Sequence, residues 1–322
     1  MRSRRAEVVA MLAAADGGFV SGERIAGALG ISRTAVAKNV EALRSLGYGI
    51  ESATRRGYRL ASLPDGLLPV EVERRLSDPF WSRVEGAAVT GSTNDDCRRL
   101  ASSGAPEGTV VVAGEQTAGR GRMGRQWLSP RGGAYFSVLL RPSISPTDAP
   151  PLALVCSLGI ASALHAAGAP VMLKWPNDVY LGMRKVAGVL LEMSAEPDRV
   201  EWIVAGCGIN VRRSSGLALD VATLDEVLPA SPAEVAALAL DGIAGVYREF
   251  VRAGFAGLAE RYGRFHLLTG REVTVRDATG AVVARGEATG VDGAGRLLVR
   301  TDSGVIPVTA GEVTLADAGG AA

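Results

Sequence analysis

The first sixty residues carry apolar positions at helical spacing and predict three short helices followed by a hairpin. Apolar residues share one face of a first helix at Val8–Leu12 and of a third helix at about 33–46. Ser21 and Ser32 stand where the second and third helices need an N-cap, and a tight turn separates these helices. Residues 48–60 have the pattern of a hairpin with a basic tip. This order of elements predicts a winged helix-turn-helix.

The middle of the chain alternates apolar runs of strand length with helical stretches, which predicts a mixed-sheet α/β domain. The most apolar run, Pro151–Leu173, is interrupted by polar residues and by Pro170, so we expect a buried helix and no membrane span. Ser231 and Pro232 begin another long helix. The expected strands cover residues 110–113, 133–140, 171–174, 184–192 and 203–211.

The pattern changes once more near residue 269, where short strands are separated by turns rich in Asp and Gly. These strands, which predict a small antiparallel barrel, cover residues 272–276, 282–285, 296–300 and 305–308. We therefore expect an α+β protein with four segments. They are a winged helix-turn-helix at 1–62, a linker at 63–80, a central domain at 81–268 and a C-terminal domain at 269–317.

Composition places the chain among ordinary globular proteins, but its charge is unevenly distributed. The 322 residues are 47% hydrophobic and 21% charged, and the net charge is only +1. Residues 1–60 hold ten Lys or Arg against five Asp or Glu, so this segment carries +5 and the remainder carries −4. The asymmetry indicates that the N-terminal end faces nucleic acid.

Cysteine and histidine usage argues against several classes of site. Cys97, Cys156 and Cys207 are odd in number and widely spaced, which favours reduced structural thiols and a cytoplasmic location. With only two histidines, we expect neither a histidine-based metal site nor a catalytic triad. The basic N-terminus is not followed by an apolar run, so we expect no signal peptide.

The predicted winged helix offers side chains suited to DNA. Ala26, Gly30 and Val36 stand where a helix-turn-helix needs a small residue, a sharp turn and a buried anchor. A recognition helix reads base edges, and a basic wing contacts phosphates. A small helical protein-interaction domain is the alternative. The candidate DNA-binding residues are Arg33, Thr34, Lys38, Asn39, Arg55 and Arg56.

One segment of the central domain, residues 115–127, holds three arginines and three glycines between Gly119 and Arg125. Such a segment has little tendency to form a helix or a strand, and its guanidinium groups can converge on anionic oxygens. Its Gly-x-Gly-x-x-Gly pattern lacks the following helix and acidic residue that a dinucleotide fingerprint requires. A solvated basic loop remains the alternative for this segment taken alone.

Polar residues also gather where other predicted elements end. Ser92–Asn94 lie at a strand-to-helix turn, where simple N-capping is the alternative. Lys174–Asp178 end a strand at Pro176, and strand ends are common places for site residues. Lys185 starts the next strand, where a solvated turn lysine is the alternative. Gly206–Asn210 combine two glycines that permit close approach with one polar side chain.

These motifs, in this order and spacing, resemble those of the bacterial biotin protein ligases, specifically the long form that doubles as the biotin operon repressor. The resemblance covers nearly the whole chain and implies that the C-terminal domain is an SH3-like barrel. The arginine segment together with Lys-Trp-Pro-Asn-Asp is specific, whereas Ser-Thr-Asn alone is weak. The motifs that carry it are Gly91–Asn94, Gln116–Trp127, Lys174–Asp178, Arg184–Gly188 and Gly206–Asn210.

The resemblance implies a ligase that uses ATP to convert biotin into biotinyl-5'-adenylate and transfers it to a lysine of biotin carboxyl carrier protein. Two anions must meet in the first step, which requires cations at the meeting point. The implied catalytic residues are Arg120, Arg122, Asp178 and Lys185, with Asp178 positioning Mg²⁺ or the incoming amine. The implied biotin-binding residues are Ser92, Thr93, Asn94, Gln116, Arg120, Gly121, Arg122 and Lys185. The implied ATP- and adenylate-binding residues are Arg122, Arg125, Trp127, Lys174, Asn177 and Asn210.

The same resemblance implies a homodimer that binds operator DNA, with biotinyl-5'-adenylate as the corepressor. Met123 departs from the family pattern, because repressor-type members often carry another arginine there. Three alternatives stay open. They are a ligand-sensing repressor that has lost catalysis, a lipoate ligase on a similar scaffold, and a ligase whose winged helix no longer binds DNA.

Overall fold

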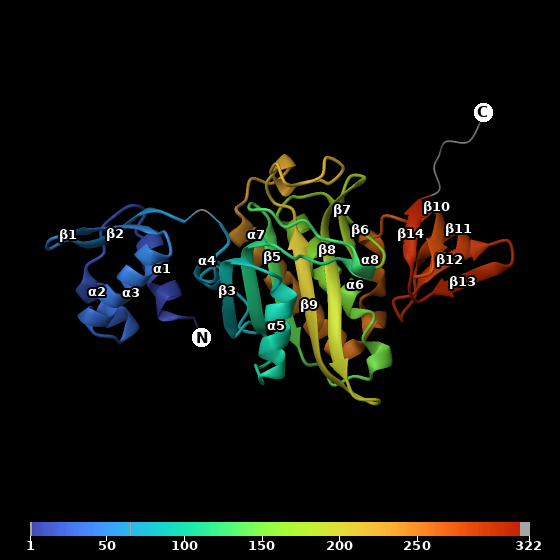
Figure 1. The fold of residues 1–322 in the computed structure, drawn as a ribbon, viewed down its shortest axis with the longest axis horizontal. Helices are drawn as coiled ribbons and strands as arrows, with labels where there is room; N and C mark the ends of the chain where they lie inside the picture. Colours follow the sequence, from blue (N-terminus) through green and yellow to red (C-terminus); the bar gives the residue numbers. More distant parts are fainter. Residues whose placement is uncertain (1, 65, 316–322) are drawn as a thin grey trace.

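The computed structural model describes residues 2–64 and 66–315. These residues form three parts along one long axis (Figure 1). A winged helix lies at one end, a large sheet with its helices lies in the middle, and a small sheet lies at the other end. The order of these parts agrees with the α+β organisation expected from the sequence.

The N-terminal part is the predicted winged helix-turn-helix, with an apolar core of its own. The side chains of Ser21 and Ser32 cap the second and third helices by accepting hydrogen bonds from the backbone. Gly30 ends the second helix with φ of 62°, a left-handed conformation that suits glycine. The elements are α1 (Arg4–Ala13), α2 (Gly22–Leu29), α3 (Arg33–Ser45), β1 (Gly49–Ala53) and β2 (Gly57–Ser62).

The segment that we expected to be a linker contains a short helix, α4 (Pro69–Glu73). Leu68 and Val70 pack into the core of the winged helix, whereas Leu67 and Val72 pack into the core of the central part. This segment therefore contacts both of its neighbours through buried side chains. The expected boundaries at residues 62 and 80 stay predictions.

The central part is a mixed sheet, which has seven strands within the described residues. The strand order is β3-β4-β5-β9-β8-β7-β6, and only β3 and β4 run parallel among these neighbours. The strands are β3 (Arg83–Thr90), β4 (Thr109–Gln116), β5 (Ala134–Leu140), β6 (Val171–Lys174), β7 (Asp178–Leu181), β8 (Arg184–Ala195) and β9 (Val200–Ile209).

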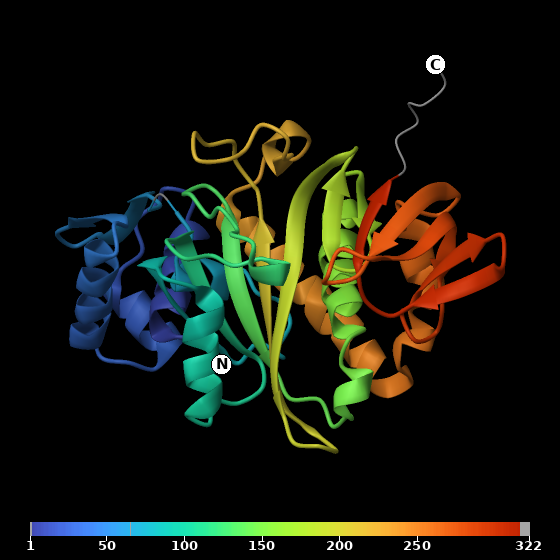
Figure 2. The same ribbon diagram turned by 45° about the vertical axis from the view of Figure 1, so that its right-hand side comes forward.

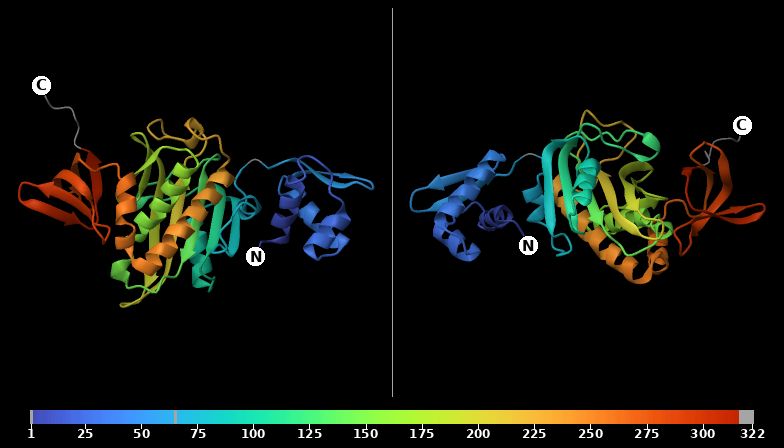
Figure 3. Two further views of the ribbon diagram at one scale, coloured as in Figure 1. Left: turned by 180° about the vertical axis from the view of Figure 1, so that it is seen from behind. Right: turned by 60° about the horizontal axis from the view of Figure 1, so that its bottom comes forward.

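Helices cover both faces of this sheet. The helix α5 (Thr93–Ser102) packs on one face, and α6 (Leu152–Ala166) and α7 (Pro232–Ala253) lie side by side across the other (Figures 2 and 3). Because side chains alternate along a strand, Val110 and Val112 of β4 belong to the core under α6 and α7, whereas Val111 packs against α5.

The most apolar run forms a core helix, as the sequence predicted. Residues Pro146–Ala166 have the length and mean hydropathy of a membrane span, but 61% of an 18-residue apolar window within them is buried inside the protein. The helix α6 packs against α7, β6, β7 and β8. Most of the apolar surface of α6 is therefore buried against these elements.

The C-terminal part is an antiparallel sheet with the order β13-β12-β11-β10-β14. Four strands correspond to those predicted, and the last strand was not expected from the sequence. Closure of this sheet into an SH3-like barrel stays a prediction. The strands are β10 (Arg271–Arg276), β11 (Val282–Val291), β12 (Leu297–Thr301), β13 (Gly304–Val308) and β14 (Glu312–Leu315), preceded by the helix α8 (Ala259–Phe265).

Candidate active site

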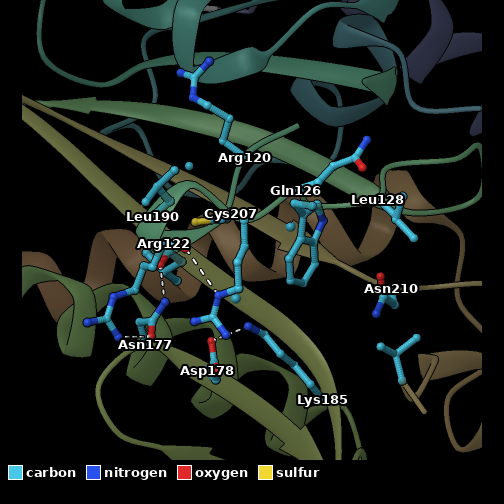
Figure 4. Close-up of a pocket in the computed structure, with 18 of the residues that line it drawn as sticks. Arg120, Arg122, Gln126, Leu128, Asn177, Asp178, Lys185, Leu190, Cys207 and Asn210 are labelled. Carbon is cyan, nitrogen blue, oxygen red and sulfur yellow. Dashed lines mark hydrogen bonds and ion pairs between the residues drawn. The ribbon is translucent and has the colours of Figure 1, made fainter. Parts of the chain in front are cut away.

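A cavity of about 470 Å³ lies where strand ends of the central sheet meet the arginine segment and the C-terminal sheet. Figure 4 shows this cavity at close range. The fourteen residues that the sequence indicated for biotin, ATP and catalysis all line it, although they come from segments far apart in the chain. The predicted site residues therefore converge on one cavity.

One end of the cavity is polar and tightly hydrogen-bonded. Thr93 at the start of α5 donates its backbone N–H and its hydroxyl to Gln116 Oε1, at 2.8 and 3.0 Å. Ser137 donates to Asn94 Oδ1 at 2.6 Å. Ser92 occupies the N-cap position, but its side chain makes no capping hydrogen bond, so N-capping does not explain this residue. The buried Ser92 side chain instead lines the cavity.

The other end of the cavity gathers charge. Lys185 Nζ lies 2.6 Å from Asp178 Oδ1 across the β7–β8 hairpin. Arg122 donates to Asn177 Oδ1 at 3.2 Å, and Lys174 donates to the Tyr180 hydroxyl at 3.3 Å. This geometry places cations beside one carboxylate.

Burial makes two of these cations receptive to an anion. Desolvation lowers the pKa of Lys174 and of Arg122 below their usual values. A half-buried cation has lost part of its hydration, and a bound anion can replace the lost interaction. This end of the cavity is therefore suited to carboxylate or phosphate oxygens.

The Trp127 indole forms one wall. Lys185 Nζ lies 5.1 Å from the centre of its ring, in a cation–π contact. A Cβ atom on Gly208 would lie 2.5 Å from Trp127 Nε1, so the indole can rest on β9 only because this position is glycine. A flat aromatic wall beside cations suits the base or ribose of a nucleotide.

The arginine segment folds into a small hairpin rather than an open loop. Gly121 N–H donates to Arg125 O at 2.7 Å, and Trp127 N–H donates to Gly119 O at 3.0 Å. At its turn, η1 (Arg122–Gly124), Met123 has φ of 56° and is half exposed. Met123 therefore faces solvent in this arrangement.

Contacts with the C-terminal sheet hold the far side of this hairpin. Arg122 Nη2 donates to Gly311 O at 3.2 Å, and Arg125 Nη1 lies 2.7 Å from Glu312 Oε1. Glu312 also lines the cavity. The sequence pattern did not single out Glu312, because nothing local marks a carboxylate whose partner lies nearly 190 residues away.

The structure does not bring the Arg120 guanidinium to the charged end. It pairs instead with Asp95, at 2.7 Å, and with Glu192, at 3.3 Å. The expected contact of Arg120 with the reacting anions stays untested. Neither acidic partner was expected to belong to the site.

Most of the candidate DNA-binding side chains are exposed. On α3, Arg33, Thr34 and Lys38 are exposed, whereas the Asn39 side chain is partly buried and donates to Ala35 O at 2.9 Å. At the wing, exposed Arg55 has φ of 65°, and Arg56 stacks at 4.2 Å over the ring of Phe19. The first helical turn of α3 and the wing tip thus present cations, and the Asn39 amide is already engaged within its helix.

Metal ligation by the protein alone has no support in the described part of the chain. No group of three or more His, Cys, Asp or Glu side chains is arranged there to hold an ion. The three cysteines are buried and unpaired, as expected for structural thiols. Any divalent cation here would need most of its ligands from a bound substrate.

Comparison with known families matches all three parts of the chain. Residues 86–210 match the biotin/lipoate A/B protein ligase family, residues 4–59 match a helix-turn-helix (HTH) domain, and residues 268–315 match the biotin protein ligase C-terminal domain. The matched segments cover nearly all of the sheet strands of the central part, most of the winged helix and the C-terminal sheet.

Individual relatives extend this match to the whole chain. The chain is 35% identical to the bifunctional ligase/repressor BirA of Bacillus subtilis (strain 168), covering 98% of this chain and 100% of that protein. It is 32% identical to BirA of Escherichia coli (strain K12), covering 97% of each. The biotin protein ligase from Aquifex aeolicus in complex with biotin and ATP is 31% identical, with a TM-score of 0.62, covering 73% of this chain and 99% of that one. Through these full-length relatives and all three matched domains, the chain belongs to the family of bifunctional biotin protein ligases and repressors.

Proposed function

We propose that this protein joins biotin to ATP as biotinyl-5'-adenylate and then transfers the biotinyl group to a lysine of biotin carboxyl carrier protein. The observation that carries the proposal is the cavity itself. Hydrogen-bonding groups line one end, whereas Arg122, Lys174 and Lys185 gather around Asp178 at the other. Biotin has a polar head group that needs hydrogen-bonding partners, and its carboxylate and the ATP triphosphate need cations. A cavity with one hydrogen-bonding end and one cationic end meets both needs.

In the first step, a biotin carboxylate oxygen attacks the α-phosphorus of ATP, and pyrophosphate leaves with the electrons of the broken bond. Both reactants are anions, so their approach is unfavourable without cations. Lys185 and Arg122 neutralise charge where carboxylate and phosphate meet, and Asp178 orients Lys185 through their 2.6 Å pair. Ser92, Thr93 and Gln116 hold the biotin head group, while Trp127, Arg125 and Asn210 border the nucleotide.

In the second step, a neutral amine of the carrier protein attacks the acyl carbon, and AMP leaves. A lysine of ordinary pKa is only about 0.04% neutral at pH 7. Asp178 is the carboxylate best placed to accept the proton that the amine loses, since it lines the cavity beside Lys185.

ATP commonly binds to enzymes together with Mg²⁺. Magnesium keeps several waters and uses one or two carboxylates plus substrate phosphates, so the lack of a preformed cluster among the described residues is compatible with it. Asp178 is the residue that would hold the ion, which would screen phosphate charge when bound.

The decisive experiment follows labelled biotin onto a carrier domain with wild type and Arg122→Ala. We expect transfer by the wild type and a loss of about 100-fold or more in kcat/KM for the variant, because one preorganised cation is removed. Arg131→Ala is the matched control, since Arg131 pairs with Glu115 and does not line the cavity. Absence of transfer by wild type would favour a ligand-sensing repressor without catalysis, and exchange triggered by lipoic acid alone would favour a lipoate ligase.

The same protein acts as a biotin-responsive repressor in the cytoplasm, binding operator DNA as a homodimer with the adenylate as corepressor. Support comes from the exposed cations of α3 and of the wing. An operator shift assay with biotin and ATP tests DNA binding. Replacing the exposed wing residue Arg55 with Ala should weaken binding and reduce the salt dependence by about one counterion.

A further inference from the structure

Two of the three arginines of the hairpin, Arg120 and Arg122, point in opposite directions (Figure 4). Arg122 reaches Asn177 and the region of the Lys185–Asp178 pair, whereas Arg120 extends away from them. Both carboxylate oxygens of Asp95 bind the Arg120 guanidinium, with distances of 2.7 Å to Nη1 and 2.8 Å to Nη2. Such a two-point pair fixes the orientation of both side chains.

Glu192 connects this pair to the polar end of the cavity. Its Oε1 lies 3.3 Å from Arg120 Nη2, and its Oε2 accepts from Asn94 Nδ2 at 2.7 Å. Asn94 is buried and accepts a further hydrogen bond from Ser137. Arg120 is thus linked through Glu192 to the residues that border the cavity.

The two carboxylates also satisfy the charge of Arg120. The hydrogen bond from Arg120 lowers the pKa of the Asp95 carboxyl below its usual value, and Arg98 approaches both acids as well. A cation shared by two carboxylates offers little additional charge to a reacting anion. Arg120 would have to break both contacts to reach one.

We propose that Arg120 is a positioning residue, and that Asp95 and Glu192 tether it so that Arg122 and Trp127 stay over the strand ends. The kinetic test of this inference rests on the proposed function, because it measures biotin-dependent exchange. Because hydrogen bonds at Gly119–Trp127 and Gly121–Arg125 close the hairpin, fixing Arg120 in one arm restrains the whole turn. Asp95 lies in α5 and Glu192 lies in β8, so both carboxylates are held by regular elements outside the hairpin.

The kinetic test is a double-mutant cycle on biotin-dependent ATP–pyrophosphate exchange. We expect Asp95→Asn and Arg120→Ala each to raise the KM for biotin about tenfold with a smaller change in kcat, and the double variant to be no worse than either. Asp96→Asn is the matched control. Asp96 lies in the same helical turn as Asp95, but it pairs with Arg99 and accepts from Thr90 at 2.6 Å.

Tryptic cleavage of the ligand-free protein gives a readout that needs no activity. Asp95→Asn keeps every arginine of the hairpin, and we expect faster cleavage there than in wild type or Asp96→Asn. Unchanged cleavage and KM in Asp95→Asn, with a severe loss in Arg120→Ala alone, would overturn the proposal and assign Arg120 to the reacting anions. If wild type lacks biotin-dependent exchange, the proposed function fails, and the cleavage comparison still decides about the tether.

Discussion

Two glycines of β9 let cavity side chains lie closer to the sheet than any other residue would permit. A Cβ atom on Gly206 would lie 2.0 Å from Asn94 Oδ1, and one on Gly208 would lie 2.5 Å from Trp127 Nε1. The sequence indicated close approach at these positions, and the structure identifies what approaches. Both glycines therefore shape the cavity directly.

Gly208→Ala should displace the Trp127 indole and lower kcat/KM for adenylate formation by about 100-fold, because a shift of about 1 Å misplaces the reactants. Tryptophan fluorescence and pyrophosphate exchange measure the two effects. Gly245→Ala is the control. Gly245 lies within α7, and a Cβ atom at this position would have no other atom within 4 Å. That variant should gain about 0.5–1 kcal/mol of stability. Equal activity of both variants would contradict this account of Gly208.

His266 predicts an acid sensitivity that a single substitution can remove. It is buried, and desolvation lowers its pKa from 6.5 to about 4. The unfolded chain takes up this proton near pH 6.5, so the free energy of unfolding falls as pH drops from 6.5 towards 4, by up to about 3 kcal/mol. Thermal unfolding of His266→Gln across this range should show a flatter profile. His165→Gln, which replaces the exposed histidine, is the matched control for a His-to-Gln substitution.

At the scale of elements, α4 is a packed connection between the winged helix and the central part. Buried Glu71 accepts from Tyr48 at 2.8 Å and pairs with Arg74 and Arg75, which are 13% and 16% exposed. Removing one partner of such a cluster leaves the others buried without compensation, which costs more than the cluster itself contributes.

Glu71→Gln should therefore lower the free energy of unfolding by about 3 kcal/mol, because two buried arginines lose their counter-charge. Tyr48→Phe should lower it by only about 1 kcal/mol, since Glu71 keeps both arginines. Denaturant unfolding measures both variants. Glu41→Gln removes a largely exposed partner of Arg44 and should change stability by less than about 1 kcal/mol. A loss in Glu71→Gln no larger than this control would show that the cluster is not stabilising.

At the scale of the whole molecule, β3 is an edge strand of the central sheet, and we propose that a second copy pairs with its exposed edge. An unpaired strand edge is a template for another strand. Thr117 and Ala118 donate backbone hydrogen bonds to Thr90 and Gly91 at the end of β3, at 2.9 and 2.8 Å. A change in the conformation of the arginine hairpin can therefore alter the position of the β3 edge through these hydrogen bonds.

We expect biotinyl-5'-adenylate to tighten self-association by about 5- to 150-fold, the usual range for coupling between two sites. The reason is that a ligand which binds the hairpin more tightly in the paired state than in the single copy shifts the equilibrium towards pairing. Sedimentation velocity with and without biotin plus ATP measures the change. Identical association constants in the two conditions would rule out this form of corepression.

The sequence alone indicated most of the elements and fourteen of the residues that line the cavity. Helical spacing and N-caps predicted α2 and α3. The glycine-arginine segment and Lys174–Asp178 indicated the residues that line the cavity. Each of these patterns lies within a few consecutive residues, so it can be recognised without the fold. The short α4 and the last strand, β14, escaped prediction, since each is defined mainly by contacts with distant segments.

Only the tertiary structure decided what each charged side chain does in the cavity. Arg120 and Arg122 look alike in sequence, yet one faces Asp95 and Glu192 and the other faces Asn177. Ion pairs depend on which groups the fold brings within a few ångströms, and Arg120 and Glu192 lie 72 positions apart. Local pattern therefore predicts the backbone and the kind of site, whereas long-range geometry assigns the partners.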